Sequence, residues 1–184
     1  MIKQRYDFDE VRKIYQENQK QLDNLVQNIV QLSCENGQTI ATAESCTGGL
    51  VAARLTEVPG ASAVFGCGIV SYNNTVKAEV LGVDPAIIEQ YTAVSAETAA
   101  AMAAAIRQKS GAAIGIGITG NAGPSASEGQ PVGLVFVAVA SEKYSHVSRL
   151  FIDRHDADAR NLIRHFAALK ALSLILRAAG YYKE

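Results

Sequence analysis

The chain lacks the residues by which several classes of protein are identified from sequence. It has no tryptophan, three cysteines and three histidines in 184 residues. The cysteines are odd in number and show no CxxC spacing, which excludes a disulfide framework. No histidine has the spacing to cysteines or carboxylates that is typical of a metal site. We therefore expect no metal and a reduced environment.

The chain also lacks an excess of charge of either sign and has no long apolar run. The 17 basic and 18 acidic residues give a net charge of −1, without a basic stripe. This balance argues against nucleic acid or an anionic membrane as a partner. The N-terminus is polar and charged, unlike a signal peptide, and no apolar run reaches the roughly 20 residues of a membrane span. We expect a soluble, cytoplasmic protein that binds neither membrane nor nucleic acid.

What is present is enough apolar sequence, 48%, for one domain with a sizeable core. Helical periodicity is found at 7–36, 50–55, 75–81, 84–90, 96–109 and from Asp158 onward. Strand-like apolar runs are found at 40–43, 63–72, 112–118, 132–140 and 145–152. This alternation predicts a three-layer α/β/α sandwich. Its sheet should be mixed, mostly parallel with one antiparallel hairpin at 132–152.

Two further expectations concern the strand at 63–72 and the N-terminus. The apolar content of 63–72 suggests a central strand, and Gly66 and Gly68 suggest that a neighbour packs closely on it. Residues 1–20 are more polar than the rest and form a predicted helical extension to a domain at 21–184. The extension is either a solvated cap or a dimer arm, and we expect a homodimer or other homo-oligomer.

The stretch T-I-A-T-A-E-S-C-T-G-G-L, at 39–50, reads as a strand that turns sharply into a helix. Glycines permit such a turn, and a helix N-terminus leaves backbone N–H groups unpaired and favourable to anions. Ser45 and Thr47 add hydroxyl groups at the same place. The stretch is therefore either a site-building turn or an ordinary helix cap.

A second candidate segment follows the strand at 63–72. Tyr72 lies at its end, and Lys77 lies in the first turn of the next helix, where a cation opposes the helix dipole. No Ser-His-Asp set is suggested by spacing, so a lysine is the candidate base for Ser45; Ser-Lys pairs are a known variant of the catalytic triad. A solvated lysine is the alternative. Cys46 is either a second candidate nucleophile or a small buried residue.

Two more segments depart from core-building sequence. Thr119 and Gly120 end a strand and precede a loop of about a dozen residues, which is long for a compact domain and suggests function. Arg160 and Arg164 lie one turn apart near the start of the last helix. They could bind a phosphate or carboxylate, or they could form surface pairs with nearby aspartates.

Several blocks, taken in order, resemble the CinA C-terminal domain family over about residues 22 to 178. They are T-A-E-S-C-T-G-G-L, V-P-G-A-S-A-V-F, G-I-V-S-Y-N-N-T-V-K, A-V-S-A-E-T-A-A-A-M-A, T-G-N-A-G-P and P-V-G-L-V-F-V-A. That family includes bacterial nicotinamide mononucleotide (NMN) deamidases. The resemblance implies hydrolysis of NMN to nicotinate mononucleotide and ammonia, without a metal or organic cofactor. It places the family's functional residues on Ser45, Tyr72, Lys77, Thr119 and Arg160, with Arg164 following.

The residues and the resemblance together suggest one mechanism. Lys77 takes the proton of Ser45, directly or through Tyr72, and Ser45 attacks the carboxamide carbon. Backbone N–H groups around Thr47 and Gly48 are expected to hold the oxyanion. Thr119 and Gly120, with the loop that follows, position the ribose or ring. Arg160, together with Arg164, is expected to hold the 5′-phosphate.

The sequence departs from the family's usual pattern at two places near the proposed ligand. Asn121 stands where the family usually has Ile, and Ser125-Ala126 stand where it has two glycines. The usual G-D-R before the last helix is Asp158-Ala159-Arg160 here. These changes motivate an alternative function, a non-catalytic nucleotide-binding or regulatory paralogue on the same scaffold.

Overall fold

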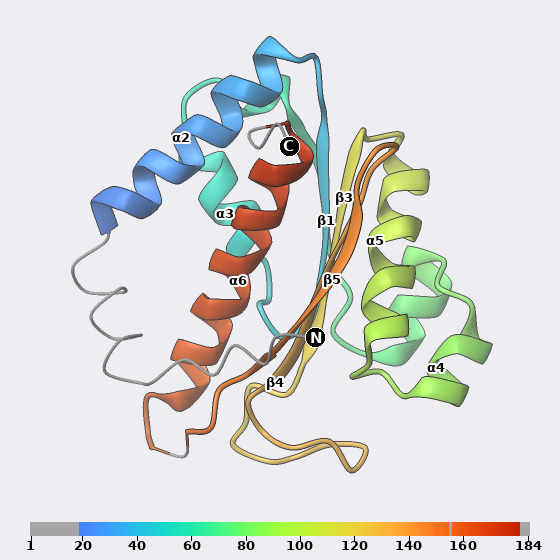
Figure 1. Ribbon diagram of the computed structural model, residues 1–184. Coiled ribbons are helices and arrows are strands. Elements are labelled where there is room, and N and C mark those ends of the chain that lie inside the picture. Colours follow the sequence, from blue (N-terminus) through green and yellow to red (C-terminus); the bar gives the residue numbers. More distant parts are fainter. Residues whose placement is uncertain (1–18, 155, 181–184) are drawn as a thin grey trace.

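A computed structural model describes residues 19–154 and 156–180 of the chain (Figure 1). The first described helix is α2 (Gln19–Glu35), which forms the later part of the helix predicted at 7–36. The earlier part of that helix, and residues 1–18 of the predicted extension 1–20, lie outside the described residues.

The sheet has five strands in the order β2-β1-β3-β4-β5. The strands are β1 (Ile40–Glu44), β2 (Phe65–Val70), β3 (Ile114–Gly120), β4 (Leu134–Ala140) and β5 (Ser145–Phe151). Strand β1 pairs in parallel with β2 and with β3, whereas β4 pairs antiparallel with both β3 and β5. Four strands therefore run one way and β4 opposes them, which confirms the mixed sheet with its β4–β5 hairpin.

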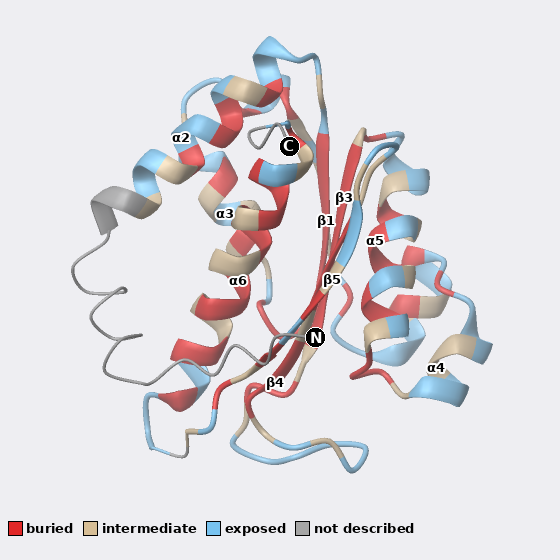
Figure 2. Ribbon diagram, viewed as in Figure 1, coloured by how far each residue is buried: buried red, intermediate tan, exposed pale blue. Residues whose placement is uncertain are grey.

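Helices cover both faces of this sheet and complete the predicted three layers (Figure 1). One face carries α2, α3 (Leu50–Thr56) and α6 (Ala159–Ala178). The other carries η2 (Val76–Leu81), α4 (Pro85–Tyr91) and α5 (Ala96–Ser110). A short 3-10 turn, η1 (Ala61–Ala63), precedes β2. Buried residues line the sheet-facing sides of the helices (Figure 2), so the main core lies between the sheet and α6.

Strand β2 corrects two expectations. It lies at the edge of the sheet and not at its centre, because apolar content reports covered faces and not strand order. The expected close neighbour is absent at Gly66, where a Cβ would meet nothing within 4 Å, but it is confirmed at Gly68, where a Cβ would lie 3.1–3.3 Å from the side chains of Phe65, Thr42 and Ala52. A much closer approach occurs on β3, where a Cβ at Gly115 or Gly117 would lie 2.2 Å from a carbonyl oxygen of α5. These glycines let the alanine-rich α5 pack directly on the sheet.

The carboxyl ends of three parallel strands meet at one edge and position the candidate site. The Ser45 N–H, just beyond β1, donates to the Ile118 carbonyl of β3 at 3.0 Å. The Ser71 N–H, just beyond β2, donates to the Glu44 carbonyl at 2.9 Å. Open α/β sheets typically bind ligands at this edge.

Candidate active site

The carboxylate of Glu44 fixes the turn between β1 and α3 through hydrogen bonds to its backbone. This side chain is 1% exposed and accepts hydrogen bonds from the N–H groups of Gly49 (3.0 Å), Val51 (3.2 Å) and Ala52 (2.9 Å). The N–H groups that were predicted to attract a ligand anion are therefore occupied by a residue of the chain itself. Glu44 serves as the cap of α3, while Ser45 and Thr47 make no cap bond to it.

The same turn is held from α6 by Arg164. Its Nε donates to the Cys46 carbonyl at 3.2 Å and its Nη2 to the Thr47 carbonyl at 3.0 Å. Its guanidinium is thus committed to the backbone of the turn, and Arg164 does not line the pocket described below. The predicted role in phosphate binding finds no support in this arrangement.

Thr47 and Gly48 also lie away from the pocket. The Gly48 N–H donates to the Ser45 carbonyl at 3.1 Å, and the Thr47 side chain is fully buried. The Gly48 N–H is already used within the turn, so it is not free to hold an oxyanion as predicted. Of the turn residues, Ser45 and Cys46 are the ones that reach the pocket.

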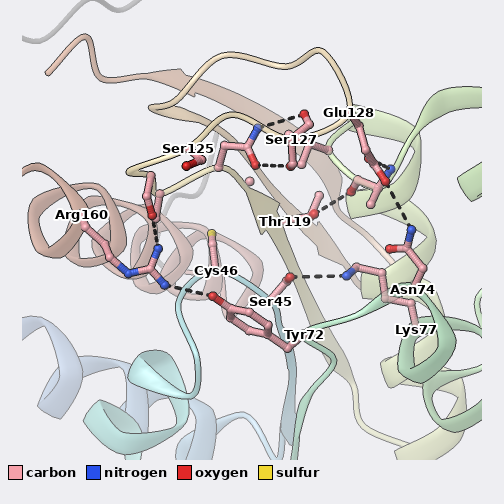
Figure 3. A pocket seen from close by; sticks show the side chains of 16 residues that line it. Ser45, Cys46, Tyr72, Asn74, Lys77, Thr119, Ser125, Ser127, Glu128 and Arg160 are labelled. Atoms are coloured by element: carbon pink, nitrogen blue, oxygen red, sulfur yellow. Dashed lines mark hydrogen bonds between the residues drawn. The ribbon is translucent and has the colours of Figure 1, made fainter. Parts of the chain in front are cut away.

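Ser45 and Lys77 meet at the floor of the pocket (Figure 3). The Lys77 Nζ lies 3.4 Å from the Ser45 Oγ and 3.0 Å from the Ser71 carbonyl oxygen. Lys77 is 2% exposed and Ser45 is 7% exposed. Lys77 reaches the serine from η2, a π-helical turn, a kind of distortion that often occurs at functional sites. The predicted alternative of a solvated lysine is therefore wrong.

The surroundings of Lys77 favour its neutral form. It forms no ion pair with any described residue. Burial lowers its pKa below the ordinary lysine value, and the charge of Glu128 opposes this effect in part. A neutral amine can accept a proton, which a serine nucleophile requires.

Cys46 does not share this activation. Burial raises the pKa of its thiol to about 12, with the Glu44 carboxylate contributing. A thiol with this pKa holds its proton at neutral pH, and the thiol is a poor nucleophile compared with the thiolate. Ser45, beside a buried amine whose pKa is lowered, is the better candidate.

Tyr72 and Arg160 form the outer rim of the pocket. The Arg160 Nη2 donates to the Tyr72 hydroxyl at 2.9 Å, and its Nη1 donates to the Gly123 carbonyl. Both side chains are exposed, Tyr72 at 59%. The surface aspartate pairs considered for Arg160 are absent; Asp156 instead pairs with Arg154. An anionic ligand could therefore replace the Tyr72 hydroxyl and the Gly123 carbonyl as hydrogen-bond acceptors of Arg160.

Thr119 and Gly120 line the pocket at the end of β3. The Thr119 hydroxyl is 1% exposed and donates to the Ala93 carbonyl at 2.6 Å. It therefore joins β3 to the segment before α5, and this bond fixes the wall from which the pocket opens.

The loop after β3 contributes residues that the sequence did not single out for a role. The Asn121 side chain donates to the Gln130 carbonyl at 2.8 Å and to the Ser127 carbonyl at 3.3 Å, and it accepts from the Ser127 hydroxyl at 2.6 Å. The departure from the family's isoleucine thus brings its own polar partners, which hold the two ends of the loop together.

Glu128, at the tip of this loop, bridges to the opposite wall. Its carboxylate accepts from the Ala93 N–H at 2.7 Å and from the Asn74 Nδ2 at 3.3 Å. Its φ of 51° is unusual for a residue with a side chain. The only sequence signal was an acidic residue before a glycine in a long loop.

These groups enclose a pocket of about 290 Å³ that is lined mainly by polar residues (Figure 3). It brings together predicted residues Ser45, Tyr72, Lys77, Thr119, Gly120 and Arg160, and leaves out Thr47, Gly48 and Arg164. Among the described residues, no group of three or more His, Cys, Asp or Glu could hold a metal ion. None of the helices in the described part of the chain is long and apolar enough to cross a membrane.

Comparison with known proteins identifies the relatives of this chain. The model of the CinA C-terminal domain matches residues 22–179. A CinA-like protein of Acidobacterium capsulatum is 45% identical over 142 residues, which cover 77% of this chain and 33% of that protein. A CinA-like protein of Synechocystis is 42% identical over 156 residues, 84% of this chain and 37% of that protein. The chain thus spans about a third of the length of these curated relatives.

Solved structures show the same fold. The crystal structure of the competence/damage inducible protein CihA from Agrobacterium tumefaciens has a TM-score of 0.79 and 34% identity, covering 85% of this chain and 94% of that one. A CinA superfamily protein from Escherichia coli has a TM-score of 0.77 and 29% identity, covering 85% and 89%.

Proposed function

Because the chain belongs to the CinA C-terminal domain family, we propose that it is an amidohydrolase of the NMN deamidase type. The proposed reaction converts nicotinamide mononucleotide to nicotinate mononucleotide and ammonia, in pyridine nucleotide recycling. The Ser45–Lys77 pair supports a serine nucleophile with a lysine base, whereas hydrolysis of the NMN carboxamide comes from the sequence's resemblance to the family's deamidases.

One observation carries the proposal: a buried lysine that pairs with no carboxylate of the described residues, and whose Nζ lies 3.4 Å from the Ser45 Oγ in a ligand-sized pocket. Burying an ammonium without a counter-charge is costly, and the lysine reduces that cost by losing its proton. A structural lysine would more often be replaced by an apolar residue or paired with a carboxylate. The arrangement fits a general base beside its nucleophile.

The proposed reaction has an acylation and a deacylation half. Lys77 accepts the Ser45 proton as the Oγ bonds to the carboxamide carbon. The C–N bond then breaks, and the nitrogen takes the proton from Lys77 and leaves as ammonia. In the second half, Lys77 takes a proton from water as the water oxygen attacks the acyl carbon. Ser45 leaves with that proton and nicotinate mononucleotide is released.

The rim supplies a phosphate site in this proposal. Arg160 would exchange its bonds to the Gly123 carbonyl and the Tyr72 hydroxyl for bonds to the 5′-phosphate, since guanidinium binds phosphate in a bidentate manner. Tyr72 then stays near the ligand as a further donor. Because the N–H groups of α3 are occupied by Glu44, the phosphate depends on side chains.

Ammonia release from NMN tests this function directly. Nicotinamide riboside, which lacks the phosphate, and free nicotinamide serve as substrate controls. We expect turnover of NMN and much slower turnover of both controls. Binding of NMN without ammonia release would contradict the proposal and favour the non-catalytic paralogue. The hydrogen bonds of Asn121 within the altered loop support the catalytic alternative, because they keep that wall ordered.

We also propose that the protein acts as a homodimer or other homo-oligomer. Gel filtration of the whole chain and of a chain without residues 1–20 tests this assembly. A smaller size only in the shortened chain identifies the extension as an assembly arm. A monomer in both cases contradicts the proposal.

A further inference from the structure

The pocket carries opposite charges on opposite walls. Among the described residues that line it, Glu128 is the one acidic side chain and Arg160 is the guanidinium. Figure 3 shows Glu128 on the side of Asn74 and Lys77, and Arg160 on the far side beyond Tyr72, with Ser45 between them. In the proposed mechanism Lys77 is neutral, so the pocket presents one negative and one positive group around the nucleophile.

Glu128 is held in place by the fold. Its carboxylate accepts from the Ala93 N–H at 2.7 Å and from the Asn74 Nδ2 at 3.3 Å, two partners on the wall opposite its own loop. Its left-handed backbone, φ 51°, is unfavourable for a residue with a Cβ and persists only where surrounding contacts enforce it. Such enforced conformations are common where a protein holds a ligand. The fold therefore fixes the position of the Glu128 charge at the pocket.

The proposed substrate has a matching pair of charges. In NMN the ring nitrogen carries the glycosidic bond, which makes the ring a permanently positive pyridinium, and the 5′-phosphate is negative. With the carboxamide carbon at the Ser45 Oγ, the ring must lie inside the pocket that Glu128 borders. If Arg160 binds the phosphate, the positive charge of the ring still lacks a counter-charge. Glu128 supplies the carboxylate that could pair with it.

We propose that Glu128 is a specificity residue that recognises the positive charge of the pyridinium ring, and so selects oxidised, N-glycosylated nicotinamide over uncharged aromatic amides. This inference rests on the proposed function and names a determinant that the mechanism does not use. The charge of Glu128 is already felt inside the pocket, because it opposes the lowering of the Lys77 pKa by burial. A cationic ring bound in the pocket would be attracted by the same Glu128 charge.

Two ligands separate charge recognition from shape. One is NMN; the other is its uncharged C-nucleotide isostere, in which a benzamide ring joined through carbon replaces the pyridinium. Both keep the carboxamide, ribose and phosphate. Binding is measured by titration calorimetry in a Ser45→Ala background, so that NMN is not consumed. We expect NMN to bind about tenfold more tightly than the isostere, a typical order for one partly solvated charge pair.

Three variants in that background test the assignment. Glu128→Gln keeps an oxygen to accept from the Ala93 N–H and removes the charge, so the ratio of affinities should fall to near one. Asn74→Ala removes one partner of Glu128 but keeps the charge, so the ratio should persist even if both ligands bind more weakly. Glu89→Gln removes an exposed charge on α4 outside the pocket and should leave the ratio unchanged.

The outcomes distinguish this inference from the function on which it rests. If Glu128→Gln weakens both ligands equally, or leaves the ratio unchanged, Glu128 is only a latch or a ribose acceptor and the inference is overturned. If the protein with Ser45 intact also releases ammonia from NMN in that case, the proposed function survives alone. If neither ligand binds and no ammonia is released, the function is overturned and the inference with it.

Discussion

The two ends of the pocket are built in different ways. At the inner end, Ser45 and Lys77 are nearly inaccessible, and the turn that carries the serine is fixed by hydrogen bonds to Glu44 and Arg164. At the outer end, Tyr72 and Arg160 are exposed and hold each other through side chains. Chemistry needs fixed positions and a shifted pKa, whereas entry of a ligand needs groups that can exchange partners. We expect kcat to depend on the inner end and KM on the outer end.

Ser45→Ala should have the largest effect, because it removes the proposed nucleophile. Loss of a nucleophile that acts with its base as a unit is expected to lower kcat by at least about 10⁴-fold. Since the α3 cap is Glu44 and not Ser45, the free energy of unfolding should change little. Steady-state ammonia release and urea unfolding measure the two quantities. Near-normal turnover would exclude the serine mechanism and return attention to Cys46.

Lys77→Ala and Lys77→Arg should both lower kcat by about 10²–10⁴-fold, the usual range for a general base. Arginine keeps the charge but does not lose its proton in proteins. In the unmodified protein the rate should rise with pH as Lys77 loses its proton. Because its pKa is lowered, this rise should come at lower pH than for an ordinary lysine. Substantial kcat in Lys77→Arg would show that the residue supplies only charge.

Glu44→Gln should separate fold support from chemistry at the inner end. The buried carboxylate accepts three N–H bonds, and an amide oxygen with its NH₂ cannot accept all of them. Hydrogen bonds to charged groups contribute about 1.5–3 kcal/mol each, so we expect a loss of about 2–3 kcal/mol in unfolding free energy. Urea unfolding measures this loss. Glu57→Gln, at an exposed pair with Arg54, is the control and should change stability by less than about 1 kcal/mol.

Arg160→Ala should act on the outer end alone. We expect KM for NMN to rise by roughly tenfold to a hundredfold, since a charged hydrogen bond to phosphate is lost, with a smaller change in kcat. The effect should disappear for nicotinamide riboside, which has no phosphate. Kinetics with both substrates provide the test. A fall in kcat equal to the rise in KM would instead place Arg160 in the chemical step and end the division between the two ends.

Much of the fold and the principal pair of the site could be predicted from the sequence. Apolar runs and helix signals report which faces are covered, and strand ends followed by polar residues mark the functional edge of the sheet. Local patterns single out Lys77 and Arg160 as candidates, and the family-like blocks place them in one site with Ser45. The edge position of β2 could not be predicted, because strand order depends on long-range pairing.

The errors at the site have one physical origin. Whether a helix N-terminus is free depends on which side chain reaches it, and here Glu44, the last residue of β1, is the cap. The hydrogen bond from Arg164 to the Thr47 carbonyl joins residues 117 positions apart in the sequence. The hydrogen bond from the Ala93 N–H to Glu128 joins residues 35 positions apart. Such contacts follow from tertiary geometry, which no local pattern contains.

The buried amine of Lys77 also couples folding to proton release. In the unfolded chain this lysine has an ordinary pKa of about 10.4, whereas in the folded protein the pKa is lower. Between these two values the unfolded chain holds one proton more than the folded protein. The contribution of this group to stability therefore rises with pH across that window, by up to about 1.4 kcal/mol per pH unit. At pH values below this window, folding must bury a charged ammonium, so the residue proposed to drive the reaction destabilises the fold there.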